Sequence, residues 1–245
     1  MKPFLALFIS FNLIAAVNGQ DTLFVYGPGG PQAPMEECGK LFSHRFSVPV
    51  KVTAGPEAKW IEEAKNKADI VFGGAEYMLI QFSMQHPGLI DSSTRTELYK
   101  RAAGILVRPG NPKKIRSFRD LSKPGIRLLD VNGAGQLGMW EDIAGKQDLI
   151  AAIQKNIVHS FGNTAQGIEA WKNDKSYDAW IIYKSWHYRL KDVTSLVTIP
   201  VSQTVFRGTP IAVTTITNQK ADALKFINFL KTSEAHKVFI KWGWE

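Results

Sequence analysis

A short apolar segment, a glycine-rich loop and a helical pattern follow one another four times in this chain. In the first copy, Leu23–Tyr26 ends at the loop Gly27–Pro31, and helical apolar spacing begins near Met35. The same order recurs at 70–75, at 128–135 and, with Asn and Thr in the loop, at 158–164. The first N–H groups of a helix lack partners and its dipole favours negative charge there. Such loops, if they converge on one crevice, would bind a small anion without any catalytic group.

The order of these elements predicts an α/β protein. A βαβαβα series fills the N-terminal third and implies a parallel sheet, with ligands at the carboxyl ends of its strands. A second series begins near residue 126. We expect strands at 22–26, 50–54, 70–72, 102–107, 126–131, 156–161, 178–183, 196–200 and 211–217, and helices at 35–46, 57–68, 75–84, 117–121, from 136, at 165–172, 220–232 and 233–242.

Two series of this kind predict two α/β lobes, joined by two crossing segments, with a ligand cleft between them. We assign 20–104 and 208–245 to the first lobe and 105–207 to the second. Two prolines and a glycine within Arg108–Pro112 indicate a change of direction, where we place one crossing. We expect hinges near Gly104–Arg108 and Gly208–Ala212.

The N-terminus has the pattern of a secretory signal peptide. Lys2 precedes an apolar run over Phe4–Val17, and small residues follow before Gln20. We predict a signal peptide at 1–19 and a periplasmic location, and no later segment reaches the ~18 apolar residues of a spanning helix.

The formal net charge of +8 agrees with anion binding but also with simple solubility. Arg108–Arg127 is the densest basic segment, and either a solvated face or docking to an acidic surface would explain it. No recognition motif for nucleic acid is present, so we predict no nucleic-acid partner.

Metal and cofactor chemistry lack support in the sequence. Cys38 is the single cysteine, on the apolar face of the first helix, where it is either a core thiol or a reactive one. The five histidines form no metal-ligand pattern, so we predict no metal site. Gly133–Gly138 matches GxGxxG, but the next strand lacks the acid that a dinucleotide site needs. With no GxSxG or Walker motif either, we predict no cofactor and no enzymatic activity.

Several residues outside the glycines are candidates for contact with an anion. Ala75 ends one loop, and Asn163 and Thr164 precede a helix that they could also simply cap. Tyr183 ends a strand, where core packing is the alternative. Lys59 and Arg207 are candidate counter-ions, although either could be a surface cation.

Motifs along the whole mature chain resemble the accessory colonization factor AcfC family of exported solute-binding proteins. They are Tyr26–Pro31, Gly55-Pro56 with Trp60, Ala68–Gly73, Gly133–Gly135 leading to Trp140-Glu141-Asp142, Asp178–Ile181 and the ending Trp242–Glu245. The resemblance implies a type II periplasmic binding protein fold, similar to that of sulfate- and molybdate-binding proteins. It also implies an oxyanion or a small phosphorylated or carboxylated ligand, a homodimer and a role in host colonisation. Carried over, the pocket residues are Gly29, Gly30, Gly74, Gly135, Gln136 and Asn163.

The function that these observations favour is capture of a small anion for an inner-membrane ABC transporter. The alternative is an exported adhesin or surface antigen that keeps the fold and acts through protein contacts. An enzyme or a signalling input on the same fold is a third alternative.

Overall fold

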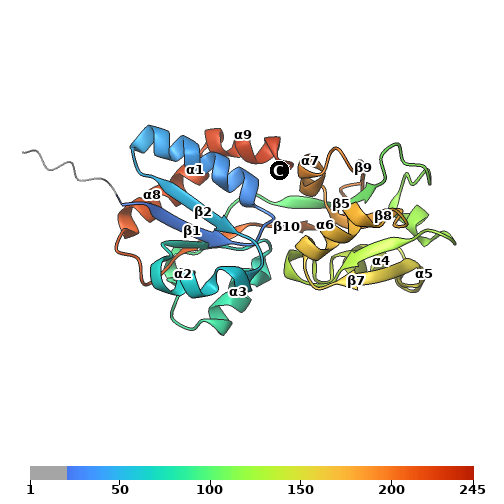
Figure 1. Cartoon of the computed structure of the whole chain (residues 1–245), viewed down its shortest axis with the longest axis horizontal. Coiled ribbons are helices and arrows are strands. Elements are labelled where there is room, and N and C mark those ends of the chain that lie inside the picture. The colour runs from blue at the N-terminus through green and yellow to red at the C-terminus, as the bar shows by residue number, and fades with distance from the viewer. Residues whose placement is uncertain (1–20) are drawn as a thin grey trace, which may run out of the picture.

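Two β-sheets, each covered by helices, form two lobes that lie side by side in the computed structural model (Figure 1). The structure describes residues 21–245, and the predicted signal peptide at 1–19 lies outside them. Each lobe has its own apolar core, and the chain crosses between the lobes twice.

Lobe 1 is built on a five-stranded sheet in the order β2-β1-β3-β11-β4. The first three strands are parallel, as the βαβαβα pattern predicts, and β11 joins antiparallel. The apolar strand side chains pack against helices on both faces, with Phe42 and Phe226 on one face and Trp60 and Phe82 on the other. The elements of lobe 1 are β1 (Leu23–Gly27), α1 (Gln32–Phe46), β2 (Val50–Ala54), η1 (Glu57–Lys59), α2 (Ile61–Lys67), β3 (Ile70–Phe72), α3 (Glu76–Gln85), η2 (Ser92–Thr94), β4 (Thr96–Glu97), β11 (Pro210–Val213), α8 (Lys220–Leu230) and α9 (Ser233–Lys241).

Lobe 2 is built on a six-stranded sheet in which β10, β5, β8, β6 and β7 are neighbours in that order and β9 also pairs with β5. Here β8, β6 and β7 are parallel and β5 runs against them. The strands β5 and β8 are buried along their whole length, so they form the centre of the core. The elements of lobe 2 are β5 (Arg101–Val107), η3 (Phe118–Ser122), β6 (Leu128–Val131), η4 (Ala134–Gln136), α4 (Met139–Gly145), α5 (Ile150–Asn156), β7 (Ile157–Phe161), α6 (Thr164–Asn173), β8 (Ala179–Tyr183), α7 (Ser185–Arg189), β9 (Ser195–Thr198) and β10 (Phe206–Arg207).

The chain changes sheet between Glu97 and Arg101 and again between Arg207 and Pro210. The second position coincides with the predicted boundary at 207/208. The predicted boundary at 104/105 falls inside β5, which pairs with β8 and β9 from Ala103 to Val107. The turn at Arg108–Pro112 therefore lies within lobe 2 rather than at a crossing.

The predicted helix that starts at 136 is three shorter elements, η4, α4 and α5. Gly138 and Asp148 take left-handed backbone conformations, with φ of 69° and 56°, and a continuous helix cannot pass through such residues. The short elements β4, β10 and α7 carry no sequence period and were not predicted.

Cys38 lies on the buried face of α1 with Met35 and Phe42, and none of the three side chains is exposed. Burial raises the pKa of the Cys38 thiol to about 12, so the thiol is a core group. Within residues 21–245 we find no helix with the length and apolarity of a membrane span.

Candidate functional site

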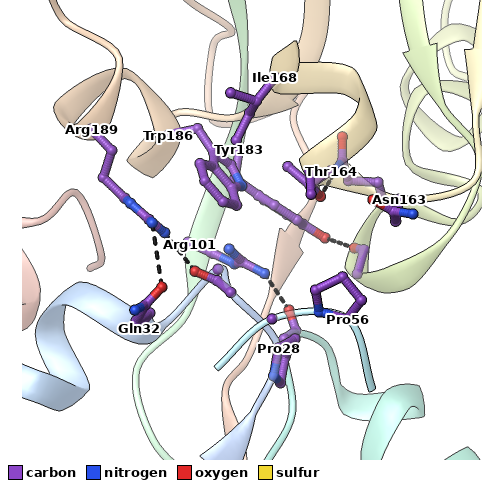
Figure 2. Close-up of a pocket in the computed structure, with 17 residues that line it drawn as sticks. Pro28, Gln32, Pro56, Arg101, Asn163, Thr164, Ile168, Tyr183, Trp186 and Arg189 are labelled. Atoms are coloured by element: carbon purple, nitrogen blue, oxygen red, sulfur yellow. Dashed lines mark hydrogen bonds between the residues drawn. The ribbon is translucent and has the colours of Figure 1, made fainter. Parts of the chain in front are cut away.

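A pocket of about 210 Å³ lies between the two lobes, where the loops that follow the strands face one another. This volume is below the ~300–1,000 Å³ of drug-sized pockets, so the pocket suits a small ligand. Figure 2 shows Pro28 and Pro56 on the lobe 1 side, with Asn163 and Thr164 opposite. The lining residues are Pro28, Gly29, Gly30, Gln32, Gly55, Pro56, Gly74, Arg101, Gly135, Gln136, Asn163, Thr164, Ala165, Ile168, Tyr183, Trp186 and Arg189.

Glycines allow the two lobes to approach each other closely at this point. A β-carbon on Gly135 would lie 3.0 Å from the carbonyl oxygen of Gly74 in the other lobe. A β-carbon on Gly30 would lie 2.6 Å from Nη1 of Arg101. Backbone groups and a guanidinium therefore occupy space that side chains would otherwise fill.

Arg101 is the first residue of β5, lines the pocket and is buried, only 2% exposed. Its Nη2 donates to the carbonyl oxygen of Gly74 at 2.5 Å, and its guanidinium lies 3.9 Å from the ring centre of Tyr183. Its Nε and Nη1 have no hydrogen-bond partner among the described residues. Burial lowers the pKa of Arg101, although an arginine keeps its proton in proteins. A buried cation with two free donors is strongly suited to an anionic ligand.

Arg189 brings a second guanidinium to the pocket from α7. Its Nη1 donates to the carbonyl oxygen of Gly29 at 2.5 Å, and its guanidinium lies 4.6 Å from the ring centre of Trp186. The Arg189 side chain stays exposed in part, and the loss of surrounding water at the pocket lowers its pKa. Both arginines enter from lobe 2 and hold carbonyl oxygens of lobe 1 (Figure 2).

Neutral polar groups at the start of α6 and in η4 form another part of the lobe 2 side of the pocket. Asn163 caps α6, because its Oδ1 accepts the N–H of Gln166 at 3.1 Å. The side chain of Gln136 donates from Nε2 to Oγ1 of Thr164 at 2.8 Å, and its Oε1 has no partner among the described residues. The hydroxyl of Tyr183 donates to the carbonyl oxygen of Gly135, and burial raises the pKa of this phenol.

Eight of the eleven residues predicted from the sequence line this pocket: Gly29, Gly30, Gly74, Gly135, Gln136, Asn163, Thr164 and Tyr183. Three do not. Lys59 is exposed at the end of η1, and the side chain of Ala75 is buried at the start of α3. Arg207 forms an ion pair with Asp142 at 2.9 Å, which holds it away from the pocket.

Sequence reasoning did not identify Arg101, Trp186 and Arg189. A charged residue directly before the apolar run 102–107 was the available signal for Arg101, since a charge next to a buried strand needs a partner. Trp186 and Arg189 lie on a five-residue helix that is too short to show a period. No local signal identified them.

The pocket has two guanidinium groups and several backbone and amide groups, and none of its lining residues in the described chain is Asp or Glu. Such a site can hold negative charge. It contains no carboxylate or histidine that could serve as a general base within the lining.

Residues 23–245 match a family model described as bacterial extracellular solute-binding protein. The crystal structure of L-phospholactate-bound PEB3 is 30% identical, with a TM-score of 0.85, and the match covers 91% of this chain and 99% of that one. PEB3 is a protein of Campylobacter jejuni. No curated protein sequence matches the chain.

Two more distant structures share the fold. The sulfate-binding protein SubI of Mycobacterium tuberculosis is 22% identical with a TM-score of 0.73, and the match covers 92% of this chain and 86% of that one. The periplasmic molybdate-binding protein of Azotobacter vinelandii is 15% identical with a TM-score of 0.70, covering 91% and 98%. These similarities agree with the predicted type II periplasmic binding protein fold.

Proposed function

Because the chain belongs to the family of bacterial extracellular solute-binding proteins, we propose that it captures a small anion between its lobes. In this proposal the anion is then released to an inner-membrane ABC transporter. The observation that carries the proposal is the buried guanidinium of Arg101, with two N–H-bearing nitrogens that no described residue satisfies. An oxyanion, carboxylate or phosphate group offers acceptors in the planar arrangement that an arginine matches.

The neutral groups around Arg101 would complete the binding site. The backbone of Gly29, Gly30 and Gly135 and the side chains of Asn163 and Thr164 supply donors without adding charge. This class of ligand agrees with the similar proteins, of which one is bound to L-phospholactate and two others are a sulfate-binding and a molybdate-binding protein. The proposed ligand is therefore an oxyanion or a small phosphorylated or carboxylated metabolite.

The resemblance to AcfC proteins extends the proposal to location and context. A periplasmic protein, a homodimer and a link to host colonisation are the parts that this resemblance adds. We place binding, rather than catalysis or adhesion, first because both lobes line the pocket with candidate anion donors, the backbone of Gly29 and Gly30 from lobe 1 and the guanidinium of Arg101 from lobe 2.

The direct test is a thermal-shift screen of the mature chain with sulfate, molybdate, phosphate esters, small carboxylates and their neutral analogues, followed by calorimetric titration. A ligand that binds only the folded state stabilises it by RT ln(1 + [L]/Kd), about 2.7 kcal/mol at a hundredfold excess over Kd. We expect a dose-dependent rise in melting temperature with an anion and none with its neutral analogue. A flat response across the whole panel would rule the proposal out.

A further inference from the structure

The net positive charge of the described residues lies in lobe 2. The part of lobe 1 that the structure describes, 21–100 with 208–245, has thirteen Lys and Arg against thirteen Asp and Glu. Lobe 2, at 101–207, has sixteen Lys and Arg against nine Asp and Glu, a net charge of +7. If the positive charge served solubility alone, we would expect it on both lobes. Because it lies on one lobe, it needs a local explanation.

Much of the excess lies in the segment 108–127, at the end of lobe 2 that is far from the pocket. Strand β5 begins at Arg101 beside the pocket and ends at Val107, which pairs with Ala179 at the opposite end of β8. Because five residues of strand span roughly 15 Å, the segment after Val107 lies well away from the pocket. Figure 1 shows this green segment on the side of lobe 2 that faces away from lobe 1. The pocket therefore does not account for these charges.

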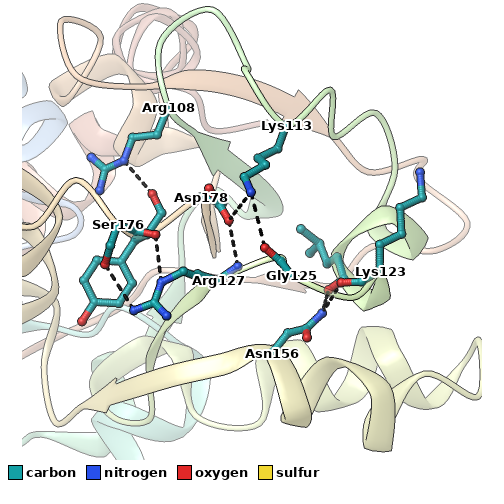
Figure 3. Close-up of polar contacts among 10 residues, drawn as sticks. Arg108, Lys113, Lys123, Gly125, Arg127, Asn156, Ser176 and Asp178 are labelled. Carbon is teal, nitrogen blue, oxygen red and sulfur yellow. Dashed lines mark hydrogen bonds and ion pairs between the residues drawn. The ribbon is translucent and has the colours of Figure 1, made fainter.

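Some of the basic groups in this segment have structural partners, as Figure 3 shows. Arg108 donates to the carbonyl oxygens of Trp171, Asp174 and Tyr177. Nζ of Lys113 lies 3.7 Å from Oδ2 of Asp178, and the guanidinium of Arg127 donates to the carbonyl oxygen and the hydroxyl of Ser176.

Asp120 is the single acid of the segment and is already occupied. It accepts the backbone N–H groups of Arg116 and Ser117 and pairs with Lys123 at 2.6 Å. On the other side of the same backbone, Asn156 donates to the carbonyl oxygens of Leu121 and Lys123. These bonds hold the backbone of the segment in place.

Three cations on this rigid frame have no partner. Lys114, Arg116 and Arg119 are exposed, and none has an ion pair or a side-chain hydrogen bond with the described residues. The apolar residues between them, Ile115 and Phe118, are 1% exposed. The segment therefore exposes these three cations and buries the large apolar and aromatic side chains between them.

We propose that Lys114, Arg116 and Arg119 dock lobe 2 on an anionic phospholipid surface. A stable protein interface is built around buried aromatic or aliphatic anchors, and this patch offers none. A flat layer of phosphate headgroups needs only exposed cations, each of which adds to the attraction. The docked molecule would keep its ligand pocket away from the lipid, since the patch and the pocket lie at opposite ends of β5.

The experiment is co-sedimentation of the mature chain with vesicles of phosphatidylcholine alone or of an equimolar mixture with phosphatidylglycerol. We expect binding to the anionic vesicles only, and loss of binding at high salt. The triple variant Lys114→Gln, Arg116→Gln, Arg119→Gln should bind these vesicles about a hundredfold more weakly, from three contacts of roughly 1 kcal/mol each. Circular dichroism should show that it is folded, because the three side chains hold nothing in place.

The matched control is Lys40→Gln, Lys51→Gln, Lys237→Gln, which removes from lobe 1 three exposed cations that make no ion pair or side-chain hydrogen bond with the described residues. It changes the net charge equally and should bind vesicles like wild type. Equal loss in both triple variants would show that only total charge matters and would overturn the proposal. An absence of binding to the anionic vesicles would also overturn the proposal. If immobilised polyglutamate then retained the protein, the result would indicate an acidic protein partner instead.

Discussion

Arg189 in α7 of lobe 2 donates a hydrogen bond from Nη1 to the carbonyl oxygen of Gly29 in lobe 1, at 2.5 Å. Its Nη2 lies 3.5 Å from Oε1 of Gln32, and Trp186 supports the guanidinium from within lobe 2. Leu137 and Tyr77 make a second link across the cleft, since the backbone N–H of Leu137 donates to the Tyr77 hydroxyl at 3.1 Å. The structure is thus a closed arrangement in which donors of lobe 2 hold acceptors of lobe 1.

We predict that Arg189→Gln weakens this closure. Loss of a charge-assisted hydrogen bond costs about 1.5 kcal/mol, which is roughly a tenfold loss in affinity, and most of it should be faster dissociation. Stopped-flow kinetics with the best ligand from the screen would measure it, and small-angle scattering should show a larger radius of gyration for the variant with ligand. The control is Arg45→Gln, which removes an exposed ion pair with Glu234 within lobe 1. Unchanged dissociation in Arg189→Gln would mean that the contact does not hold the lobes together.

Arg101→Gln should abolish most of the binding without unfolding the protein. Two hydrogen bonds from a buried cation to an anion are worth about 3 kcal/mol or more, so the affinity should fall at least a hundredfold. The melting temperature without ligand should stay level or rise, because the substitution removes a buried charge that makes no ion pair with any described carboxylate.

Arg108→Gln is the matched control for this substitution. Arg108 also lies against an aromatic ring, 3.7 Å from the ring centre of Trp171, but its guanidinium is satisfied by three carbonyl oxygens. Its loss should lower the melting temperature and leave affinity unchanged. If the two variants behave alike in calorimetry and thermal melts, Arg101 is a structural residue and not the anion contact.

Asp120 gives the protein a component of stability that acid removes. The Lys123 ammonium, and then the N–H groups of Arg116 and Ser117, hold the pKa of this carboxyl well below its usual value. A carboxyl group whose pKa is lower in the folded state than in the unfolded state, where it is near 4, stabilises the folded protein at pH values above 4. This contribution is lost as the pH falls from 4 toward the folded-state pKa. Asp120 belongs to the capping box at the start of η3, where its carboxylate accepts the backbone N–H of Ser117. Asp120→Asn should therefore lower the free energy of unfolding by about 1 kcal/mol at neutral pH, the usual worth of a helix cap, and by less near pH 3. Urea titrations at both pH values would measure this, with the exposed Asp192→Asn as the control; a constant difference at both pH values would contradict it.

The glycine loops were predictable from the sequence because strand, loop and helix follow one another locally. The carboxyl ends of parallel strands meet at one edge, so the positions of Gly29, Gly74 and Gly135 relative to the pocket follow from the pattern. The two lobes were also predictable, because the order of strands and helices within each lobe can be seen locally in the sequence.

The arginines of the pocket were not predictable, because their position depends on tertiary contacts. Arg207 and Arg101 have the same chemistry in sequence, but Asp142 forms an ion pair with Arg207, whereas no carboxylate among residues 21–245 does so with Arg101. The first crossing was misplaced for a related reason. Prolines at 109 and 112 indicate a turn, and only the pairing of β5 with β8 shows that the turn follows the strand in lobe 2.

Gly135→Asp tests the second-lobe loop. The β-carbon would lie 3.2 Å from Nη2 of Arg101, so the new carboxylate would sit beside the cation that we assign to the ligand. The carboxylate would form an ion pair with Arg101 and repel an incoming anion. The repulsion energy is about 4 kcal/mol for two charges ~4 Å apart at an effective dielectric of ~20. The expected result in calorimetry is roughly a thousandfold loss of affinity. The melting temperature without ligand should hold or rise, because Arg101 gains a partner.

Gly135→Ala separates this charge effect from the steric one. Gly135 is not among the glycines with a left-handed φ, so alanine fits its backbone without strain. Its β-carbon would still meet the carbonyl oxygen of Gly74 at 3.0 Å, and the lobes would have to part by a few tenths of an ångström to admit it. We therefore expect a loss of about tenfold, or about 1.4 kcal/mol, far below that of the Asp variant. Equal losses in the two variants would assign the whole effect to crowding between the lobes, whereas wild-type binding by a folded Gly135→Asp would remove this loop from the anion site.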